Sequence, residues 1–337
     1  MSSNTVRSAA SRLDHNLSAR ILAVMSPNAT QGSDRTPVLH PATVQVGDEL
    51  RLVSPGSPPN RDDVLQTQRT LEGWGLKVSL GDNVFNKYGY LAGTDEERLG
   101  DVNAALRDTS VRAIIATRGG KGSYRIANQL DFDAARSDPK FLVGFSDVTI
   151  LHMSLWKHSR IVGLHGALYF DETTGDSPHL RSESLRAALM TGGPTIIASR
   201  GEESTAQLTT SGTARGRLLG GNLDMIATGA GWALPDLHGA ILLIEAVDLY
   251  LGQVDRYLTM LRNAGHLDGI AGIAVGQFTK FNPSKGITII GLLRDHLSRL
   301  GVPILGGLPL GHGDRPVTVR LGAAAVLDAN AGTLTVE

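Results

Sequence analysis

The most informative absences in this chain are cysteine, long apolar runs and an excess of one charge. None of the 337 residues is cysteine, so disulfide bonds, thiolate metal sites and a cysteine nucleophile are excluded. No apolar run approaches the roughly 20 residues of a membrane-spanning helix, so no membrane partner is expected. The 32 basic and 33 acidic residues give a formal net charge of −1, which argues against a nucleic-acid partner, because such proteins need a basic surface.

The remaining composition is that of an ordinary globular protein. With 41% hydrophobic and 19% charged residues, the chain is long enough for two domains of average size. Residues 1–38, rich in Ser, Asn, Ala and Thr, are predicted to be a disordered tail. No metal-binding spacing such as His-Glu-x-x-His occurs, so we expect neither a metal nor another cofactor.

Strand-like and helix-like segments alternate between residues 39 and 170. The expected strands are, in chain order, Glu49–Val53, Leu76–Leu80, Val111–Ala116 and Phe141–Gly144. Segments with helical spacing lie between them, at residues 62–74, 95–107 and 123–130. Such alternation is typical of a parallel sheet covered on both faces, so residues 39–170 are predicted to form an α/β domain.

The pattern changes after residue 170. Residues 171–205 are rich in Gly, Ser, Pro and Thr and are predicted to be a linker with one helix at residues 180–190. From residue 206 to 337, short apolar runs are separated by glycines, with expected strands at residues 240–244, 270–275 and 324–327. This spacing predicts a second, β-rich domain.

A serine follows the fourth expected strand directly. Ser146 lies in the segment Gly144-Phe145-Ser146-Asp147, where the strand ends and a helix-like segment begins. A serine held on such a turn exposes its hydroxyl beside the positive end of a helix, which suits a nucleophile. Serine is also a favoured helix N-cap, and the motif Gly-x-Ser-x-Gly is absent, so a capping role stays open.

A glycine-rich loop, Arg118-Gly119-Gly120-Lys121-Gly122, follows the third expected strand. Because the carboxyl ends of parallel strands meet at one edge of a sheet, this loop should lie near Ser146. Neither standard phosphate-binding glycine motif is present. We expect N–H groups of this loop and of Asp147 to converge on one oxygen as an oxyanion hole, with a plain tight turn as the alternative.

A serine nucleophile needs a base, and the base needs an orienting partner. Glu245 closes an apolar run, and His312 lies in a loop between two glycines, so a strand-end carboxylate and an accessible imidazole are present. Each is also a common residue at an ordinary surface position. His152 and His165 lie closer to Ser146 in sequence, and His165 is the main rival for the base.

Together these segments resemble the LD-carboxypeptidase family of serine peptidases, which includes muramoyltetrapeptide carboxypeptidases and microcin C immunity peptidases. The resemblance covers about residues 40–337. It rests on seven segments: Val53-Ser54-Pro55-Gly56, Arg118-Gly119-Gly120, Gly144-Phe145-Ser146-Asp147, His165-Gly166, Gly216-Arg217-Leu218-Leu219-Gly220-Gly221-Asn222-Leu223, Leu243-Ile244-Glu245 and Gly306-Gly307-Leu308-Pro309-Leu310-Gly311-His312.

The resemblance implies a Ser-His-Glu triad. Ser146 would be the nucleophile, His312 the base and Glu245 its orienting partner, with the backbone N–H groups of Gly120 and Asp147 as oxyanion donors. The implied fold is a flavodoxin-like parallel-sheet N-terminal domain and a β-rich swivelling C-terminal domain, with the site between them. Family members of the peptidoglycan-recycling type release the terminal D-alanine of a murein tetrapeptide in the cytoplasm, usually as homodimers.

Three departures from the family pattern leave the substrate open. Lys121 stands where an aromatic residue is common, Ala246 where aspartate is common and Ala167 where proline is common. A murein tetrapeptide and a peptidyl- or aminoacyl-nucleotide both remain candidate substrates. Arg118, Lys121 and Trp232 are expected substrate contacts, although Lys121 also fits a solvated position and Trp232 a packed core. A non-catalytic sugar- or nucleotide-binding protein is the competing class, supported by the glycine-rich loop alone.

Overall fold

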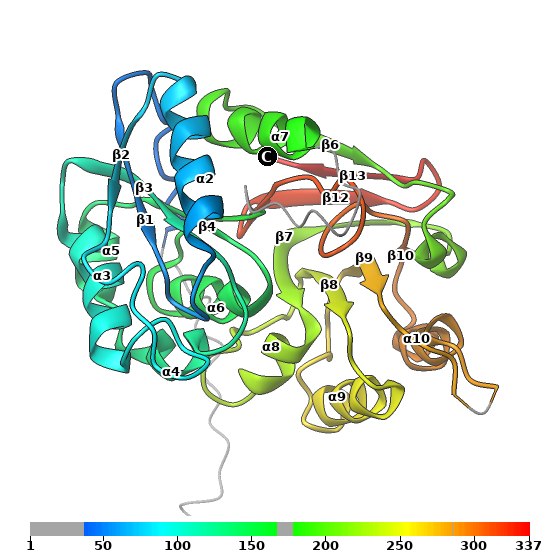
Figure 1. The fold of residues 1–337 in the computed structure, drawn as a ribbon. Helices are drawn as coiled ribbons and strands as arrows, with labels where there is room; N and C mark the ends of the chain where they lie inside the picture. The colour runs from blue at the N-terminus through cyan, green and yellow to red at the C-terminus, as the bar shows by residue number, and fades with distance from the viewer. Residues whose placement is uncertain (1–36, 167–177, 285) are drawn as a thin grey trace, which may run out of the picture. The chain divides into compact units, whose positions relative to one another are not determined.

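The computed structural model of the chain describes residues 37–166, 178–284 and 286–337, and its strands form two sheets (Figure 1). The predicted tail, residues 1–38, lies outside the described residues except for its last two. Ala167 and residues 171–177 of the predicted linker also lie outside them. Among the helices that the structure describes, none has the combined length and apolar character needed to span a membrane.

The first sheet has six strands in the order β11-β5-β4-β3-β1-β2. They are β1 (Glu49–Val53), β2 (Lys77–Leu80), β3 (Val111–Ala116), β4 (Phe141–Gly144), β5 (Gly163–His165) and β11 (Val319–Leu321). The first five strands pair in parallel, and β11 pairs antiparallel with β5. The order 2-1-3-4-5 is that of the flavodoxin-like doubly wound fold, so the predicted class of the N-terminal part is confirmed.

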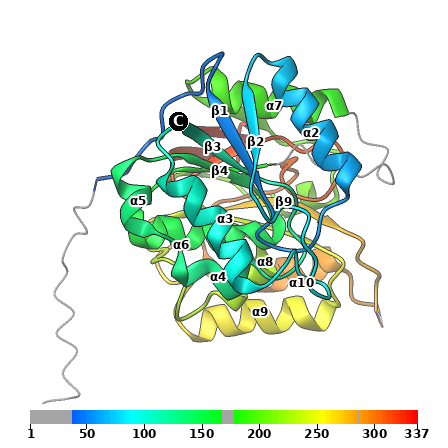
Figure 2. The ribbon, with the colours of Figure 1, turned by 60° about the vertical axis from the view of Figure 1, so that its left-hand side comes forward.

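Helices cover both faces of this sheet, as its apolar strands require (Figure 2). They are α2 (Arg61–Gly73), α3 (Asp95–Arg107), α4 (Ser123–Ile126), α5 (Phe132–Ser137), α6 (Thr149–Ser159) and the 3₁₀ turn η1 (Ala127–Gln129). Successive residues of β3 point to opposite faces, so Ile114 packs with Leu106 of α3 and Ile115 packs with Leu71 of α2. The sheet is therefore buried on both sides, and ligands have access at its edges and strand ends.

The second sheet has seven strands in the order β10-β9-β8-β7-β12-β13-β6. They are β6 (Thr195–Ala198), β7 (Thr213–Asn222), β8 (Ile241–Val247), β9 (Gly272–Thr279), β10 (Ile304–Leu305), β12 (Ala324–Asp328) and β13 (Thr333–Val336). Strands β7 to β10 pair in parallel, whereas β12, β13 and β6 add antiparallel pairs. The remaining helical elements are α7 (Pro178–Met190), η4 (Ser204–Leu208), α8 (Leu223–Thr228), α9 (Leu251–Asn263), α10 (Ile289–Leu297) and η5 (Ser298–Leu300). The sequence predicted a second, β-rich part of the chain, and this sheet, with parallel and antiparallel pairs, is present there.

Two strands depart from the expected organisation. The predicted linker, residues 171–205, contains β6, which forms the edge of the second sheet by pairing with β13. Strand β11, from the predicted C-terminal domain, belongs to the first sheet, because Val319 pairs with His165 at the end of β5. Both strands are short, and their partners are remote in sequence, so local periodicity carried no signal for either pairing.

The two sheets meet where β7 ends and α6 begins. Asn222, the last residue of β7, donates its backbone N–H to Oγ1 of Thr149, the first residue of α6, over 3.1 Å. Gly221 has a φ of 133°, and a Cβ atom added to it would lie 2.8 Å from the same Oγ1 atom. Glycine is therefore needed for this close approach, which brings the second sheet against the turn that carries Ser146.

Candidate active site

Ser146 occupies a strained turn between the end of β4 and the start of α6. Its φ of 62° lies in the left-handed region, which residues other than glycine adopt at an energetic cost. The 3₁₀ turn η2 (Ser146–Val148) leads directly from it into α6. This is the type of strand–turn–helix geometry that exposes a nucleophilic serine above the end of a strand.

The alternative of a helix-capping serine does not fit the turn. Phe145 occupies the N-cap position of η2 and Val148 that of α6, and neither helix start has a side-chain cap hydrogen bond. Within the described residues, the Ser146 hydroxyl makes no hydrogen bond. The hydroxyl is therefore not committed to the backbone and is available to a substrate.

The glycine-rich loop after β3 lies directly against the Ser146 turn. A Cβ atom added to Gly119 would stand 3.0 Å from Ser146 Cβ and 3.1 Å from Asp147 N, so a side chain there would crowd the turn. The next residue, Gly120, has a φ of 93°. In the part of the chain that the structure describes, the backbone N–H groups of Gly120 and Asp147 donate no hydrogen bond. Two unpaired donors next to the serine are the requirement of an oxyanion hole.

Ser57, in the loop after β1, fixes the conformation of the glycine-rich loop. Its backbone N–H donates to the carbonyl oxygen of Gly119, and its Oγ accepts the N–H of Lys121, each over 3.0 Å. A Cβ atom added to Gly120 would lie 2.4 Å from the same Oγ atom, so the loop depends on glycine at that position. The loops after β1 and β3 are thus joined at the switch point of the sheet, where ligands of this fold class bind.

Two buried polar side chains brace the same region. The Asp147 carboxylate, 2% exposed, accepts the Ser123 N–H at Oδ2 over 2.8 Å, and burial raises its pKa. Arg98, 1% exposed, donates through Nη1 to the carbonyl oxygens of Pro55 and Gly122. Since hydrogen bonds to charged groups are stronger than neutral ones, these contacts hold the glycine-rich loop and the Ser146 turn in place.

Glu245 and His312 form a buried hydrogen-bonded pair on the second sheet. Glu245 lies on β8 with no exposed surface, and its Oε2 lies 2.6 Å from Nδ1 of His312. Its Oε1 accepts the side-chain N–H of Asn222 over 3.0 Å. Burial on its own raises the pKa of Glu245, but the interactions with His312 outweigh it and hold the pKa below its ordinary value. An ionised carboxylate only accepts, so Nδ1 of His312 carries the proton.

The His312 loop is held by side chains at the end of β9. Thr279 donates its hydroxyl to the carbonyl oxygen of His312 over 3.3 Å, and Gln277 accepts the N–H of Gly313 over 2.8 Å. A Cβ atom added to Gly311 would lie 2.6 Å from Glu245 Oε2, so glycine is required just before the histidine. The loop therefore presents the imidazole in one orientation.

The imidazole of His312 lies next to the serine turn. Its ring centroid is 4.6 Å from that of Phe145, the residue that immediately precedes Ser146. Within the described residues, no hydrogen bond joins Ser146 to His312. Catalytic hydrogen bonds of this kind are often long before a substrate binds, so the arrangement is compatible with a serine–histidine pair.

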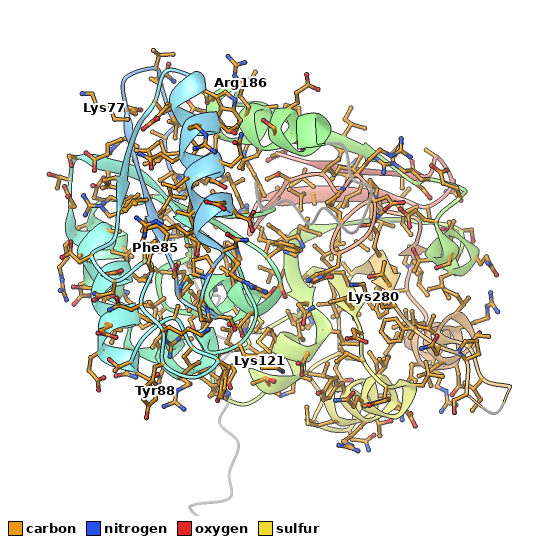
Figure 3. All side chains as sticks on the ribbon, viewed as in Figure 1. Lys77, Phe85, Tyr88, Lys121, Arg186 and Lys280 are labelled. Carbon is orange, nitrogen blue, oxygen red and sulfur yellow. The ribbon has the colours of Figure 1, made fainter. Side chains whose placement is uncertain are left out.

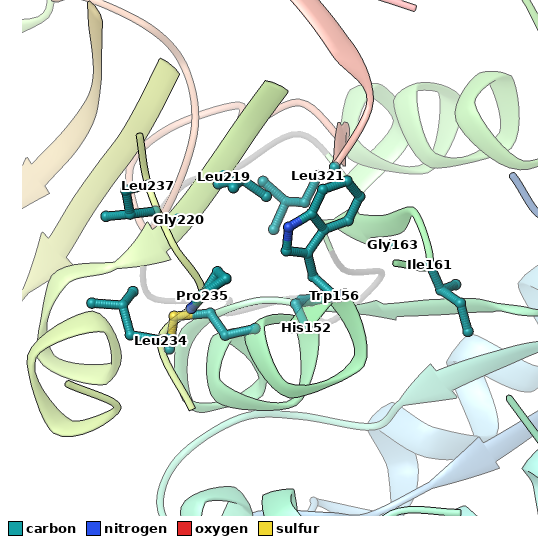
Figure 4. Close-up of a pocket in the computed structure, with 12 residues that line it drawn as sticks. His152, Trp156, Ile161, Gly163, Leu219, Gly220, Leu234, Pro235, Leu237 and Leu321 are labelled. Carbon is teal, nitrogen blue, oxygen red and sulfur yellow. The ribbon is translucent and has the colours of Figure 1, made fainter. Parts of the chain in front are cut away.

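The rival histidines are buried away from solvent. His165 is 1% exposed and His152 5% exposed, and burial lowers the pKa of each to about 4. Nε2 of His152 lies 3.0 Å from the Gly144 carbonyl oxygen, and the ring lines an apolar pocket with Trp156 (Figure 4). The side chain of His312 is 17% exposed, so it is the most accessible of these three imidazoles.

The predicted substrate contacts divide into two groups. Lys121 and Arg118 lie in the glycine-rich loop, and Lys121, which is labelled in Figure 3, is exposed. Trp232 lies elsewhere: its carbonyl oxygen accepts the side chain of Lys157, at the end of α6 opposite to Ser146. Its indole N–H donates to the carbonyl oxygen of Thr228, and the partly buried Trp232 packs against the core, which is the alternative that the sequence left open for it.

Several residues at the site escaped the sequence reasoning. Ser57, Arg98 and Gln277 were given no role, and Asn222 was noted only as part of a family segment. Each acts through a partner more than 20 residues away, which spacing along the chain does not reveal. The proline-rich loop that contains Ser57 was the one available signal, because it ends a strand at the expected ligand-binding edge.

Comparison with known proteins gives the class to which this fold and site belong. The solved structure of the microcin C7 self immunity protein MccF in complex with aspartyl sulfamoyl adenosine has the same fold, with a TM-score of 0.78 and 23% identity over 89% of this chain and 98% of that chain. A muramoyltetrapeptide carboxypeptidase from Oxalobacter formigenes has a TM-score of 0.74 and 29% identity, covering 85% of this chain and 97% of the other.

Sequence comparison is more specific. The "Probable murein peptide carboxypeptidase" of Bacillus subtilis is 33% identical over 301 residues, covering 88% of this chain and 94% of that protein. Residues 50–166 match the LD-carboxypeptidase N-terminal domain, and residues 215–327 match the LD-carboxypeptidase C-terminal domain. The chain therefore belongs to the LD-carboxypeptidase family, and it is a hydrolase of the peptidase class.

Proposed function

We propose that this protein is a serine carboxypeptidase that hydrolyses the L–D amide bond of a murein tetrapeptide and releases the terminal D-alanine. The observation that carries the proposal is the 2.6 Å hydrogen bond between His312 and the buried Glu245, with the imidazole packed beside the strained Ser146 turn. A nucleophile, a base and an orienting carboxylate then act in sequence.

The first half of the reaction forms an acyl-enzyme. Ser146 Oγ attacks the carbonyl carbon of the scissile amide while Nε2 of His312 takes the hydroxyl proton. Glu245 stabilises the imidazolium through Nδ1, and the N–H groups of Gly120 and Asp147 stabilise the tetrahedral oxyanion. When the C–N bond breaks, His312 returns the proton to the leaving amine, and D-alanine departs.

The second half removes the acyl group. A water molecule gives one proton to His312 and attacks the ester carbon, again forming a tetrahedral oxyanion. Collapse of this intermediate breaks the ester bond, and His312 protonates Ser146 Oγ. The tripeptide leaves with a new carboxylate, and the enzyme regains its starting state.

The relatives support a murein peptide as substrate, since one is named for murein peptide and a solved one for muramoyltetrapeptide. The MccF structure, which holds an aminoacyl-nucleotide analogue, is the basis for the alternative of a peptidyl- or aminoacyl-nucleotide substrate. In this chain, Trp232, the expected substrate contact whose aromatic ring could stack on a nucleobase, packs at the far end of α6. This position favours the peptide substrate.

A direct assay with both substrate types tests the proposal. Purified protein is incubated with a murein tetrapeptide or with an aspartyl sulfamoyl adenosine, and the products are identified by mass spectrometry. We expect stoichiometric release of D-alanine and tripeptide, and no cleavage of the nucleoside analogue. Cleavage of the analogue with an intact tetrapeptide would establish the alternative.

Asn222 provides a prediction about the orientation of Glu245. Replacing Asn222 by Ala removes one of two hydrogen bonds to a fully buried carboxylate. We expect the free energy of unfolding to fall by about 1.5–3 kcal/mol, the usual range for a hydrogen bond to a charged group, and kcat to fall about tenfold. Urea unfolding and D-alanine release measure the two effects. Asn263→Ala, at an exposed position, is the matched control, and equal behaviour of both variants would contradict the prediction.

The cellular location, the oligomeric state and the domains that contribute the site residues are also part of the proposed function. We propose that it acts in the cytoplasm as a homodimer in peptidoglycan recycling, with Ser146 contributed by a domain of residues 39–170 and Glu245 and His312 by residues 206–337. The family resemblance supports these points. Light scattering of the purified protein distinguishes a dimer of twice 35.7 kDa from a monomer.

A further inference from the structure

His165 is a buried imidazole that the mechanism above does not use. Its side chain is 1% exposed, and in the part of the chain that the structure describes neither ring nitrogen makes a hydrogen bond. Buried polar atoms are nearly always paired, because an unpaired one costs free energy, so this imidazole needs an explanation. Burial lowers the pKa of His165 to about 4, so near neutral pH the ring carries one donor and one acceptor. Both are available to a bound molecule.

His165 lies at the same end of the first sheet as the serine turn. It is the last residue of β5, and it is paired with Gly144, the last residue of the parallel strand β4. The ring of Phe145 points its edge at the His165 ring, with 6.1 Å between the centroids, and the same Phe145 ring lies 4.6 Å from that of His312. Because ligands of parallel sheets bind at the carboxyl ends of strands, His165 lies where reacting groups are expected.

A small cavity adjoins both His165 and the residues next to the proposed nucleophile and base. Phe145, which precedes Ser146, and Gly311, which precedes His312, both line it. The other residues of its wall are His165, Gly166, Pro316, Val317 and Thr318. The cavity has a volume of about 10 Å³, about the space that a single water molecule requires. A buried water also needs polar partners, which the imidazole and the threonine hydroxyl supply.

We propose that this cavity binds one water molecule through His165 and that this water hydrolyses the acyl-enzyme. The inference rests on the proposed function, because the second half of that reaction consumes a water that must stand near both Ser146 and His312. The cavity meets this requirement, since its wall includes the residue directly before each of them. A water that is already in place avoids the entropic cost of being brought from bulk solvent at the moment of attack.

His165 is a positioning residue in this step. The water gives one proton to Nε2 of His312 while its oxygen forms a bond to the ester carbon. The ester C–O bond then breaks, and His312 passes the proton to Ser146 Oγ. His165 holds the water through a hydrogen bond and neither gains nor loses a proton, so only hydrolysis of the acyl-enzyme depends on it. The attack of Ser146 on the amide does not.

Two substrates separate the two halves of the reaction. For the tetrapeptide, kcat/KM covers the steps up to the release of D-alanine. The 4-nitrophenyl ester of the corresponding tripeptide acylates the enzyme rapidly, so its kcat measures hydrolysis of the acyl-enzyme. We expect His165→Leu to lower kcat for the ester at least about tenfold, the factor for one lost hydrogen bond in that step. It should leave kcat/KM for the tetrapeptide within about threefold, whereas a merely structural role would lower both.

Two further variants and one structure complete the test. His165→Gln keeps a group that donates and accepts hydrogen bonds, so its kcat for the ester should stay within about threefold of wild type. His238→Leu, at an exposed position, is the matched control for loss of an imidazole and should change neither parameter. Circular dichroism shows whether each variant is folded. A crystal structure of the wild-type protein should contain a water oxygen about 2.7–3.2 Å from a ring nitrogen of His165, which tests the site without any variant.

The outcomes distinguish this inference from the proposed function. If folded His165→Leu loses both parameters equally or loses neither, or if the wild-type crystal structure has no water at His165, the inference is wrong while the proposed function stands. If the wild-type protein hydrolyses the ester and leaves the tetrapeptide intact, the proposed function is wrong, and kcat for the ester alone decides the inference. A wild-type protein that hydrolyses neither substrate overturns both.

Discussion

Replacement of Ser146 by alanine is expected to abolish D-alanine release, with kcat reduced by a factor of about 10⁴ or more, as for other triad enzymes that lose their nucleophile. The hydroxyl makes no hydrogen bond within the described residues, so its removal should not disturb the fold. The measurement is tetrapeptide turnover under substrate saturation, with thermal unfolding followed in parallel. Ser211→Ala, an exposed serine before β7, should retain full activity.

A second substitution at the same position separates chemistry from strain. Ser146→Gly also removes the nucleophile, but glycine adopts a φ of 62° without cost. We therefore expect Ser146→Gly to be inactive and yet more stable than Ser146→Ala by about 1 kcal/mol, the penalty for a left-handed residue with a Cβ atom. Hydrolysis retained in either variant would show that Ser146 is not the nucleophile. Equal stability of the two would show that the turn is not strained.

The buried histidines predict a large loss of stability in mild acid. The pKa of both His152 and His165 falls from 6.5 to about 4 on burial, so both are neutral in the folded protein near neutral pH. Between these two values the unfolded chain binds protons that the folded protein does not. The stabilisation that comes from keeping these histidines neutral is therefore fully present above pH 6.5. It decreases as the pH falls toward 4 and is lost below that pH. The shift in pKa corresponds to a loss of about 3 kcal/mol of unfolding free energy for each histidine.

Urea unfolding at a series of pH values between 7 and 4 measures this effect. His165→Gln removes one of the two buried imidazoles and should reduce the loss of unfolding free energy across this range by about half. His238→Gln, at an exposed position, should leave the pH dependence unchanged. A pH profile of stability that is the same in His165→Gln and in the wild-type protein would contradict the assignment of the acid sensitivity to that histidine.

The first sheet was the part of the fold most accessible from sequence. Its strands are mainly apolar and are separated by helical segments, and some helix starts have local signals, such as the Thr94–Glu97 capping box of α3. The expected strand at residues 111–116 coincides with β3, and the helix expected at residues 95–107 coincides with α3. Parallel strands buried on both faces leave a clear signal, a short and nearly continuous apolar run such as that of β3 and β4.

The parts that could not be predicted depend on contacts between distant segments. Strand β6 has four residues and only one of them is buried, so its alternation is too short to be distinguished from a linker. The hydrogen bond between Thr149 and Asn222 joins residues 73 positions apart and forms only because the two sheets approach each other. Trp232 was expected to contact the substrate, with core packing as the alternative, and its location depends on the packing of α8 against α6, which no local pattern encodes.

In the candidate site, too, some features could be predicted from local sequence and others depend on contacts between distant segments. The positions of Ser146 and of the glycine-rich loop follow from the rule that ligands bind at the carboxyl ends of parallel strands. The choice among three histidines did not follow from sequence, because Glu245 selects its partner only through the three-dimensional approach of β8 to the loop after β10. The family resemblance supplied that choice, and the residues that hold the pair, Gln277 and Thr279, were visible only in the structure.

The antiparallel strand β11 gives the first sheet a dependence on the far end of the chain. It covers the hydrogen-bonding edge of β5, so a fragment that stopped at residue 170 would leave that edge bare and prone to pair with other chains. The sheet that leads into Ser146, the proposed nucleophile, is thus completed only after nearly all of the polypeptide has been synthesised. The serine turn, which follows β4 next to this edge, would acquire its final environment late in folding, when the histidine loop is also in place.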